Sequence, residues 1–224
     1  MKTFASILPL GLAGLAAAHP AVEARDRPTR TGKVNGQQVV SYVAKFDDVV
    51  NTGLAPGVPV RGITPLGPYD SLYYDNLGVI NDGAALAGVK PFSKPNVLAY
   101  DIVAEGQGQQ TIRADYDDSI TDFFNFKSFY FGCVLSTQET ADSAPLNCQV
   151  QIQGYRNQQQ VASQVATFTT DGLASSMDKV TLNSGFSNVD QVTFDTQGLN
   201  ALLAGVLLDN LAYDVHLKKG KTIS

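Results

Sequence analysis

Three aspartates near opposite ends of the sequence have the chemistry of a calcium site. Asp47 and Asp48 lie in the first segment with β-strand character, and Asp209 lies in the last one. Calcium takes six to eight oxygen ligands at about 2.3–2.6 Å from carboxylates, amides, carbonyls and water. If these segments are neighbouring strands, a structural ion would relieve the repulsion between the carboxylates. The alternative is that the aspartates cap strand ends through hydrogen bonds to the backbone.

A group of tyrosines with polar neighbours could hold a sugar. Pyranose C–H groups pack on aromatic faces, while amides and carboxylates bond the hydroxyls. The tyrosines are Tyr69, Tyr73, Tyr74 and Tyr100, and the polar residues are Asp70, Asp75 and Asn76. Alternation along a strand sends Tyr73 and Tyr74 to opposite faces, so both cannot belong to one platform. The alternative is ordinary inward packing of the tyrosines, and the absence of tryptophan weakens the sugar interpretation.

A second acidic run could serve glycoside hydrolysis, in which one carboxyl group is the acid and another the base or nucleophile. The run comprises Asp115, Asp117, Asp118 and Asp122. We interpret it as a solvated acidic loop or a second, weak calcium site, because nothing in the sequence indicates the burial that raises a carboxyl pKa. For an alternative function as a polysaccharide lyase or hydrolase, the candidate residues are Tyr100, Arg113 and Asp115.

Copper chemistry and nucleophilic catalysis find little support. His19 would become the N-terminal residue after cleavage at Ala18, and with His216 it could form the copper brace of oxidative polysaccharide monooxygenases. Its place in a flexible leader argues against that reading. The chain has no G-x-S-x-G motif, and histidines near the chain ends make a Ser-His-Asp triad improbable.

Composition excludes several classes of function. The 224-residue chain is 44% hydrophobic and 17% charged, which provides apolar material for a sizeable core. Its net charge of −5 argues against binding to nucleic acid or to anionic lipid. Two histidines and two cysteines leave few ligands for a zinc, haem or iron–sulfur site.

The beginning of the sequence predicts secretion. Residues 1–18 combine Lys2, an apolar stretch and a small-residue end, the pattern of a signal peptide with an A-x-A cleavage site. Residues 19–38 are polar and contain three arginines, which predicts a flexible leader or propeptide. We expect one folded domain over residues 39–217 and a polar tail over residues 218–224. No later segment has the length and apolarity of a membrane span, so the expected location is extracellular or in the cell wall.

The two cysteines predict a disulfide. In an oxidising compartment Cys133 and Cys148 most simply pair with each other. Closing the loop between them is worth about 3 kcal/mol in the chain-entropy model. The enclosed residues are polar and typical of turns, so we expect the bond to tie a hairpin loop to the ends of its strands.

Strand periodicity dominates the rest of the sequence. β-Branched and aromatic residues recur in short segments separated by turn residues. The segments are Val39–Val50, Asn96–Val103, Phe123–Val134, Gln149–Tyr155, Val161–Thr169, Lys179–Leu182, Gln191–Phe194 and Leu207–Leu217. Strict alternation over residues 149–153 predicts that Val150 and Ile152 point inward. The pattern predicts an all-β protein, an antiparallel β-sandwich.

The order of several segments resembles that of known secreted β-sandwich proteins. The segments are Phe46–Val49, Tyr69–Leu77, Pro95–Tyr100, Phe126–Cys133, Val150–Tyr155, Val189–Phe194 and Leu208–Tyr213. They resemble a widespread group of secreted fungal proteins and, more distantly, exported bacterial proteins of the PEP-CTERM type. The resemblance implies a galactose-binding-like jelly roll. That fold hosts sugar-binding, adhesive and enzymatic members, so the resemblance is specific for fold and not for function.

These features predict a secreted, non-catalytic protein that binds a glycan or a host or cell-wall surface molecule, as an effector or a wall-associated factor. The expected ligand-binding residues are Tyr69, Tyr73, Tyr74, Asp75 and Asn76, and the expected calcium ligands are Asp47, Asp48 and Asp209. Expected partners are a glycan or a host extracellular protein, with neither nucleic acid nor membrane. The alternatives are a carbohydrate-active enzyme on a jelly-roll scaffold and a scaffolding protein that acts through its surface.

Overall fold

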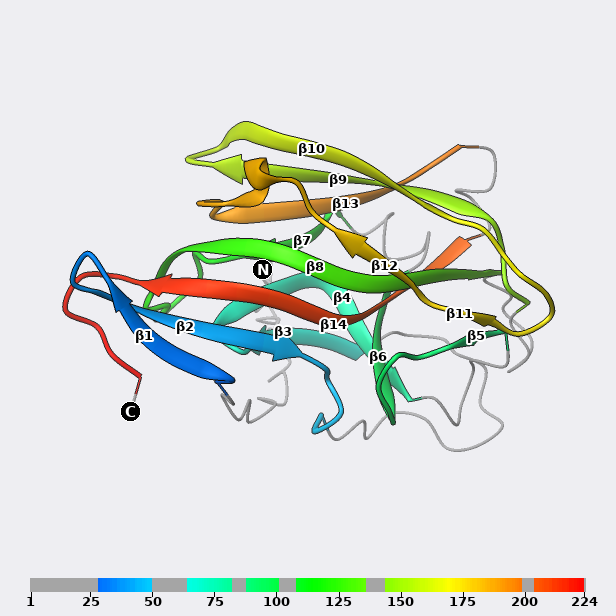
Figure 1. Cartoon of the computed structure of the whole chain (residues 1–224), viewed down its shortest axis with the longest axis horizontal. Coiled ribbons are helices and arrows are strands. Elements are labelled where there is room, and N and C mark those ends of the chain that lie inside the picture. The colour runs from blue at the N-terminus through cyan, green and yellow to red at the C-terminus, as the bar shows by residue number, and fades with distance from the viewer. Residues whose placement is uncertain are drawn as a thin grey trace, which may run out of the picture.

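The protein is built almost entirely from β-strands (Figure 1). The computed structural model describes residues 28–49, 64–81, 88–100, 108–135, 144–198 and 204–223. Within them the one helical element is a short 3-10 turn, η1 (Ser184–Phe186). Twelve strands join in one large sheet whose pairings are antiparallel, and two short strands pair separately in parallel. The prediction of an all-β, antiparallel fold is therefore confirmed.

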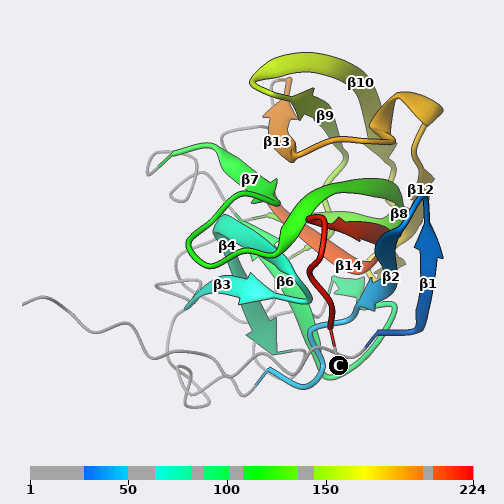
Figure 2. The ribbon, with the colours of Figure 1, turned by 90° about the vertical axis from the view of Figure 1, so that its left-hand side faces the viewer.

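The large sheet bends into two facing layers (Figure 2). The first, called the β8 layer, contains β1 (Arg30–Val34), β2 (Gln37–Ala44), β8 (Thr121–Leu135), β12 (Asp178–Thr181) and β14 (Ala204–Leu217). The second, called the β9 layer, contains β3 (Thr64–Tyr69), β4 (Leu72–Asn81), β7 (Gln110–Arg113), β9 (Cys148–Arg156), β10 (Gln159–Phe168) and β13 (Gln191–Gln197). Strand β6 (Asn96–Tyr100) joins the layers, because it pairs with β14 on one side and β4 on the other.

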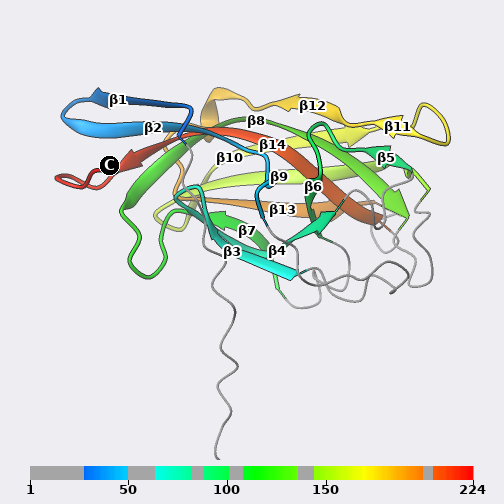
Figure 3. The ribbon, with the colours of Figure 1, turned by 90° about the horizontal axis from the view of Figure 1, so that it is seen from below.

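Strand β14 is the central strand of the β8 layer. It pairs with β8 along most of its length, and on its other side with β6 and then β2. The register places Leu211 opposite Ala44, so the prediction that the first and last predicted segments are neighbours is confirmed. The β1–β2 hairpin lies at one end of the molecule, and the two-stranded pair of β5 (Val89–Lys90) and β11 (Ser175–Ser176) lies at the other (Figure 3).

The folded part begins earlier and ends later than the sequence predicts. Arg30–Val34 lies within the predicted leader yet forms β1, paired with β2. All five of its residues are exposed, so no hydrophobic alternation marks it as a strand. Near the other end, the amide N–H of Ile223 donates to the Gln38 side chain at 3.0 Å. Part of the predicted polar tail is therefore held against β2.

Aromatic side chains fill the space between the layers. Phe129 of β8 lies edge-to-face with Phe194 of β13, with ring centroids 5.8 Å apart. Phe131 of β8 makes a similar contact with Phe168 of β10 at 6.0 Å. Val150 and Ile152 of β9 are fully buried, which confirms the alternation predicted for this strand. Burying side chains of this size stabilises the fold by about 1.5–3 kcal/mol each.

Two tight hairpins shape the β9 layer. The β9–β10 hairpin turns at Asn157 and Gln158, and the β3–β4 hairpin turns at Asp70 and Ser71. All four residues have positive φ, between 46° and 66°, as type I′ turns require at both central positions. Asn and Asp tolerate this backbone better than other non-glycine residues.

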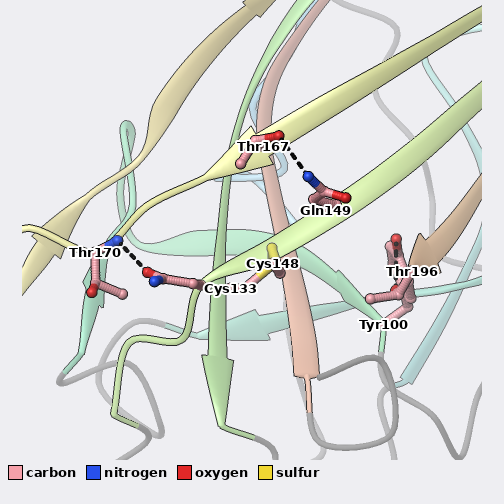
Figure 4. Close-up of a disulfide and its surroundings, with 8 residues drawn as sticks. Tyr100, Cys133, Cys148, Gln149, Thr167, Thr170 and Thr196 are labelled. Atoms are coloured by element: carbon pink, nitrogen blue, oxygen red, sulfur yellow. Dashed lines mark hydrogen bonds between the residues drawn. A yellow bond between two sulfur atoms is a disulfide. The ribbon is translucent and has the colours of Figure 1, made fainter. Parts of the chain in front are cut away.

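The disulfide between Cys133 and Cys148 is formed, as predicted (Figure 4). Its two ends belong to different layers, since Cys133 lies in β8 and Cys148 begins β9. Just before Cys148 the chain still pairs with β8, because the Leu146 N–H donates to the Cys133 carbonyl at 2.8 Å. The bond therefore links the two layers and does not close a simple hairpin of neighbouring strands.

Candidate ligand-binding site

A pocket of about 240 Å³ opens at the β3–β4 turn. Its lining residues are Pro68, Tyr69, Asp70, Ser71, Tyr116, Asp118 and Ile120. Two segments therefore build it: the type I′ turn and the loop that follows β7. That loop is part of the acidic run singled out in the sequence, so Asp118 adds a carboxylate to the rim.

An aromatic and charged patch adjoins the pocket on the outer face of the β9 layer. Tyr73 and Tyr116 have ring centroids 5.7 Å apart, and the Arg113 guanidinium lies 4.6 Å from the Tyr73 centroid. Arg113 Nε donates to Asp75 Oδ2 at 2.5 Å, with both side chains about one-third exposed. The patch forms because Tyr73 pairs with Arg113 across β4 and β7, which places both side chains on one face. We call these four residues the Tyr73 patch.

Three buried tyrosine hydroxyls lie beneath the β3–β4 turn. Tyr42 Oη lies 3.0 Å from Ser71 Oγ, and Tyr213 Oη donates to the Asp70 carbonyl at 3.1 Å. Tyr74 Oη lies 3.3 Å from Tyr213 Oη. Burial raises the pKa of the Tyr74 and Tyr213 hydroxyls above their ordinary value, so both are neutral. These bonds satisfy polar groups in the core and hold the turn that shapes the pocket.

The predicted tyrosines do not form one platform. Tyr73 is half-buried on the outer face, whereas Tyr74 is 1% exposed on the inner face, so their predicted opposite orientation is confirmed. Tyr69 is also buried and donates its hydroxyl hydrogen to Asp48 Oδ1 at 2.7 Å. Tyr100 is fully buried, with its hydroxyl oxygen 3.5 Å from that of Thr196 (Figure 4). Of the four tyrosines, Tyr73 is the one that is not buried, while Tyr69 contributes to the lining of the pocket.

The remaining predicted ligand residues, Asp75 and Asn76, follow Tyr73 along β4. Asp75 lies on the same face as Tyr73 and is held by Arg113. Asn76 donates its side-chain N–H to the Gln109 carbonyl at 3.0 Å, which ties β4 to the start of β7. Tyr116 was missed by the sequence reasoning, because its contact with Tyr73 depends on how the loop after β7 folds. An isolated tyrosine in an acidic loop carries no signal of that contact.

The three predicted calcium ligands are only partly brought together. Asp209 is fully buried, and its carboxylate accepts from Ser93 N at 2.7 Å, Ser93 Oγ at 3.1 Å and Asn210 N at 2.7 Å. Burial raises its pKa to about 6, and the nearby charge of Asp47 adds to the shift. Asp48 instead accepts from Tyr69.

Each of the three carboxylates therefore accepts at least one hydrogen bond in the present structure. Asp47 Oδ1 accepts the backbone N–H of Asn96 at 3.2 Å. Across the described parts of the chain, no three His, Cys, Asp or Glu side chains are grouped to hold a metal ion. The bonds to Asp47 and Asp209 match the backbone-capping alternative, while calcium binding stays a prediction.

The other candidate residues are scattered. Asp122 forms an ion pair with Arg156 at 3.2 Å. His216 stacks on Phe123 with ring centroids 4.2 Å apart and lies 3.1 Å from the Asn125 amide nitrogen, and burial lowers its pKa. His19 lies outside the described residues. For the predicted enzyme candidates, the structure buries Tyr100 in the core and leaves Arg113 on the outer face.

Comparisons with known proteins add no relative. No protein-family model and no curated protein matches the chain. Within the described residues, no helix has the length and apolar character needed to span a bilayer. The chemistry of the Tyr73 patch and of its pocket is therefore the basis for a functional proposal.

Proposed function

We propose that this is a secreted, non-catalytic protein with a jelly-roll β-sandwich, which binds a glycan of a cell wall or host surface through the Tyr73 patch. The observation that carries the proposal is the contact of Tyr73 with Tyr116, beside the Arg113–Asp75 ion pair and the pocket. An aromatic face takes the C–H groups of a sugar ring, and flanking charged groups bond its hydroxyls. Both kinds of group stand side by side here.

Support for secretion comes from the predicted signal peptide and from the disulfide. Disulfides persist in oxidising compartments, which include the extracellular space. Support for a non-catalytic role comes from the enzyme candidates, because Tyr100 is buried in the core, apart from Arg113 and Asp115, and the Arg113 guanidinium is bound to Asp75 and to the Asp115 carbonyl. A binding function needs none of these residues to react.

The test is retention of the pure protein on insoluble cellulose, chitin, β-1,3-glucan, xylan and mannan. We expect the wild-type chain to be retained by at least one polymer. Tyr73→Ala and Tyr116→Ala should each weaken retention about tenfold, since a ring contact contributes on the order of 1 kcal/mol. Release of soluble sugars during the incubation would instead favour the enzyme alternative.

A second aromatic pair provides the matched control. Tyr130 of β8 stacks on Phe92 with ring centroids 3.7 Å apart, and Lys179 Nζ lies 5.8 Å from the Tyr130 centroid. Tyr130→Ala therefore removes a tyrosine with a similar aromatic and cationic setting from the other layer. Equal losses from Tyr130→Ala and Tyr73→Ala, or no retention of the wild-type chain on any polymer, would overturn the proposal.

A further inference from the structure

We propose that the binding surface continues from the Tyr73 patch across β13 and β9 as a strip of amide side chains, and that its ligand is an uncharged, linear polysaccharide. The amide strip consists of Gln149, Gln151, Gln153, Gln191 and Gln197. This inference rests on the proposed glycan-binding function and specifies its ligand class. It also assigns a role to the glutamine-rich strands, which the Tyr73 patch does not use.

Strand register makes the patch and the strip one continuous face. Tyr73 lies opposite Arg113, Arg113 opposite Gln191, and Gln191 opposite Tyr155. Paired residues of neighbouring strands point to the same face, and strands lie about 4.8 Å apart. The row from β4 to β9 therefore crosses roughly 14 Å of surface. A parallel row runs from Asp75 through Thr111 and Thr193 to Gln153, but Thr111 and Thr193 are buried, so the exposed connection is the first row.

Alternation in β9 and β13 places the amides outward. Val150 and Ile152 of β9 are fully buried, whereas Gln149 is exposed and Gln151 and Gln153 are half-exposed. In β13 the buried residues are Val192, Thr193, Phe194 and Thr196, whereas Gln191 is half-exposed and Gln197 is exposed. Strand β9 thus presents polar, uncharged side chains to solvent at every second position, and β13 adds Gln191 and Gln197 at its two ends.

Hydrogen bonds across strands hold the amides in place. Gln151 Nε2 donates to Ser163 Oγ of β10 at 2.5 Å, and Gln153 Nε2 donates to Gln160 Oε1 at 3.1 Å. Gln153 Oε1 also accepts from Tyr155 Oη at 3.2 Å. An amide group can make four hydrogen bonds, so each side chain retains capacity for a ligand. Side chains that are already ordered lose less entropy on binding.

The scarcity of charged side chains around the amide strip favours an uncharged ligand. Among the outward residues of β9, β10 and β13, the one charged side chain is Asp195, which accepts from Gln197. A polyanion requires lysine or arginine partners, and the core of a protein interface is rich in aromatic residues and arginine. Amides both donate and accept, as neighbouring hydroxyls of a neutral sugar do. The amide strip therefore matches a neutral polysaccharide better than it matches a polyanion or a protein partner.

A hollow of about 390 Å³ lies at the far end of the strip. Asn147 and Gln197 line it, together with Gln149, Thr167 and the disulfide-bonded Cys148, which Figure 4 shows. Along β9 the distance from Tyr155 to Gln149 is roughly 20 Å at about 3.4 Å per residue. A surface of this extent contacts several consecutive sugar units, so affinity should depend on chain length.

The test measures calorimetric affinity for neutral oligosaccharides of increasing length, taken from a polysaccharide that retains the wild-type protein. We expect affinity to rise with length and to be insensitive to salt. The double variant Gln151→Ala/Gln153→Ala should lose about tenfold for the longest oligosaccharide, as expected for two lost hydrogen bonds, and bind the shortest like wild type. Gln38→Ala, which removes an amide from β2 in the other layer, should bind like wild type throughout.

The outcomes separate the two proposals. Loss of binding in Tyr73→Ala with no effect of the double variant would overturn the amide strip and leave the proposed function standing. Tighter, salt-sensitive binding of polygalacturonate would overturn the uncharged ligand class. Absence of wild-type binding to every polysaccharide would overturn the proposed function itself. If the double variant melts below wild type, Gln151→Glu keeps the side-chain length and tests the same position by adding a charge, for which we also expect weaker binding.

Discussion

The polar side chains on the outer faces of the two layers find hydrogen-bond partners in different ways. On the β8 layer, Lys127 Nζ lies 2.6 Å from Asp214 Oδ1, and Ser41 also donates to that oxygen. On the β9 layer, the exposed and half-exposed side chains of β9 and β13 are mainly glutamines. The charged face satisfies its groups by internal pairing, whereas the amide face retains hydrogen-bonding capacity. Strand alternation is similar in both layers, so side-chain chemistry distinguishes a solvated face from a candidate binding face.

The two layers also differ in the surroundings of two aromatic pairs, Tyr73–Tyr116 and Phe92–Tyr130. Tyr116, the partner of Tyr73, lines a pocket, and an ion pair fixes the arginine beside Tyr73. Phe92 and Tyr130 stack closely, yet Phe92 remains 55% exposed. An aromatic pair with a cation is therefore not a sufficient criterion for a site. The adjoining pocket and polar row make the difference.

The largest expected effect on stability comes from removing the disulfide that links the two layers. Replacing both cysteines, Cys133→Ser/Cys148→Ser, should lower the free energy of unfolding by about 3 kcal/mol, because the unfolded chain gains the entropy of an open loop. Urea denaturation measures this change. Amide exchange should accelerate more near Cys148 than near the β9–β10 turn at Asn157. Uniform acceleration over β9 would show that the bond does not act locally between the layers.

The next effect is a pH dependence from Asp209 in the β8 layer. Its folded-state pKa is raised to about 6, so between pH about 4 and 6 the folded state holds a proton that the unfolded state has released. The stability contribution of this group is fully present at low pH and is lost as the pH rises through about 6, by on the order of 3 kcal/mol. Asp209→Asn should remove this part of the pH dependence.

Urea denaturation at several pH values measures that difference between wild type and variant. Asp117→Asn is the control, because it removes an exposed carboxylate from a loop. A variant whose stability follows the wild-type pH profile would contradict the assignment to Asp209.

A smaller effect distinguishes the two outer faces directly. Lys127→Ala breaks an ion pair with an exposed lysine and should change the free energy of unfolding by less than about 1 kcal/mol, without any change in polysaccharide retention. Gln151→Ala should leave stability within about 0.5 kcal/mol of wild type while weakening retention. Thermal melting and the retention assay on both variants check this contrast. Weaker retention by Lys127→Ala would place ligand contacts on the charged face.

Chelation separates the capping alternative from the predicted calcium site. If the hydrogen bonds from Ser93 and Asn210 to the Asp209 carboxylate are all that this group needs, EDTA should leave the melting temperature unchanged. A decrease that calcium reverses, and that Asp209→Ala abolishes, would instead support the calcium site that the sequence predicts.

The sequence predicted strands where alternation and β-propensity agree. Residues 149–153 and Leu207–Leu217 have both signals and form parts of β9 and β14. Strands β3 and β7 were missed for physical reasons. β3 contains Pro65, Gly67 and Pro68, which disfavour strands, and β7 has only four residues. Such strands form because longer neighbours give them partners.

The candidate site was less predictable than the fold. Tyr73 and Asp75 could be named from the residue types that bind sugars, but Arg113 reaches them only through the pairing of β4 with β7. The proximity of Asp47 to Asp209 could be predicted, because the first and last predicted strand segments were expected to be neighbours. The hydrogen bonds from Ser93 to Asp209 could not be predicted, because the loop that contains Ser93 has no regular pattern. Long-range pairing, and not local composition, decides these contacts.

The central position of β14 sets the order in which the molecule can fold. Strands β2, β6 and β8 all pair with it, so none can complete its hydrogen bonding until residues 204–217 have left the ribosome. Pairings of such high sequence separation form slowly. A nascent chain halted before residue 204 would expose the unpaired edges of three strands, which makes it a target for proteases and for aggregation.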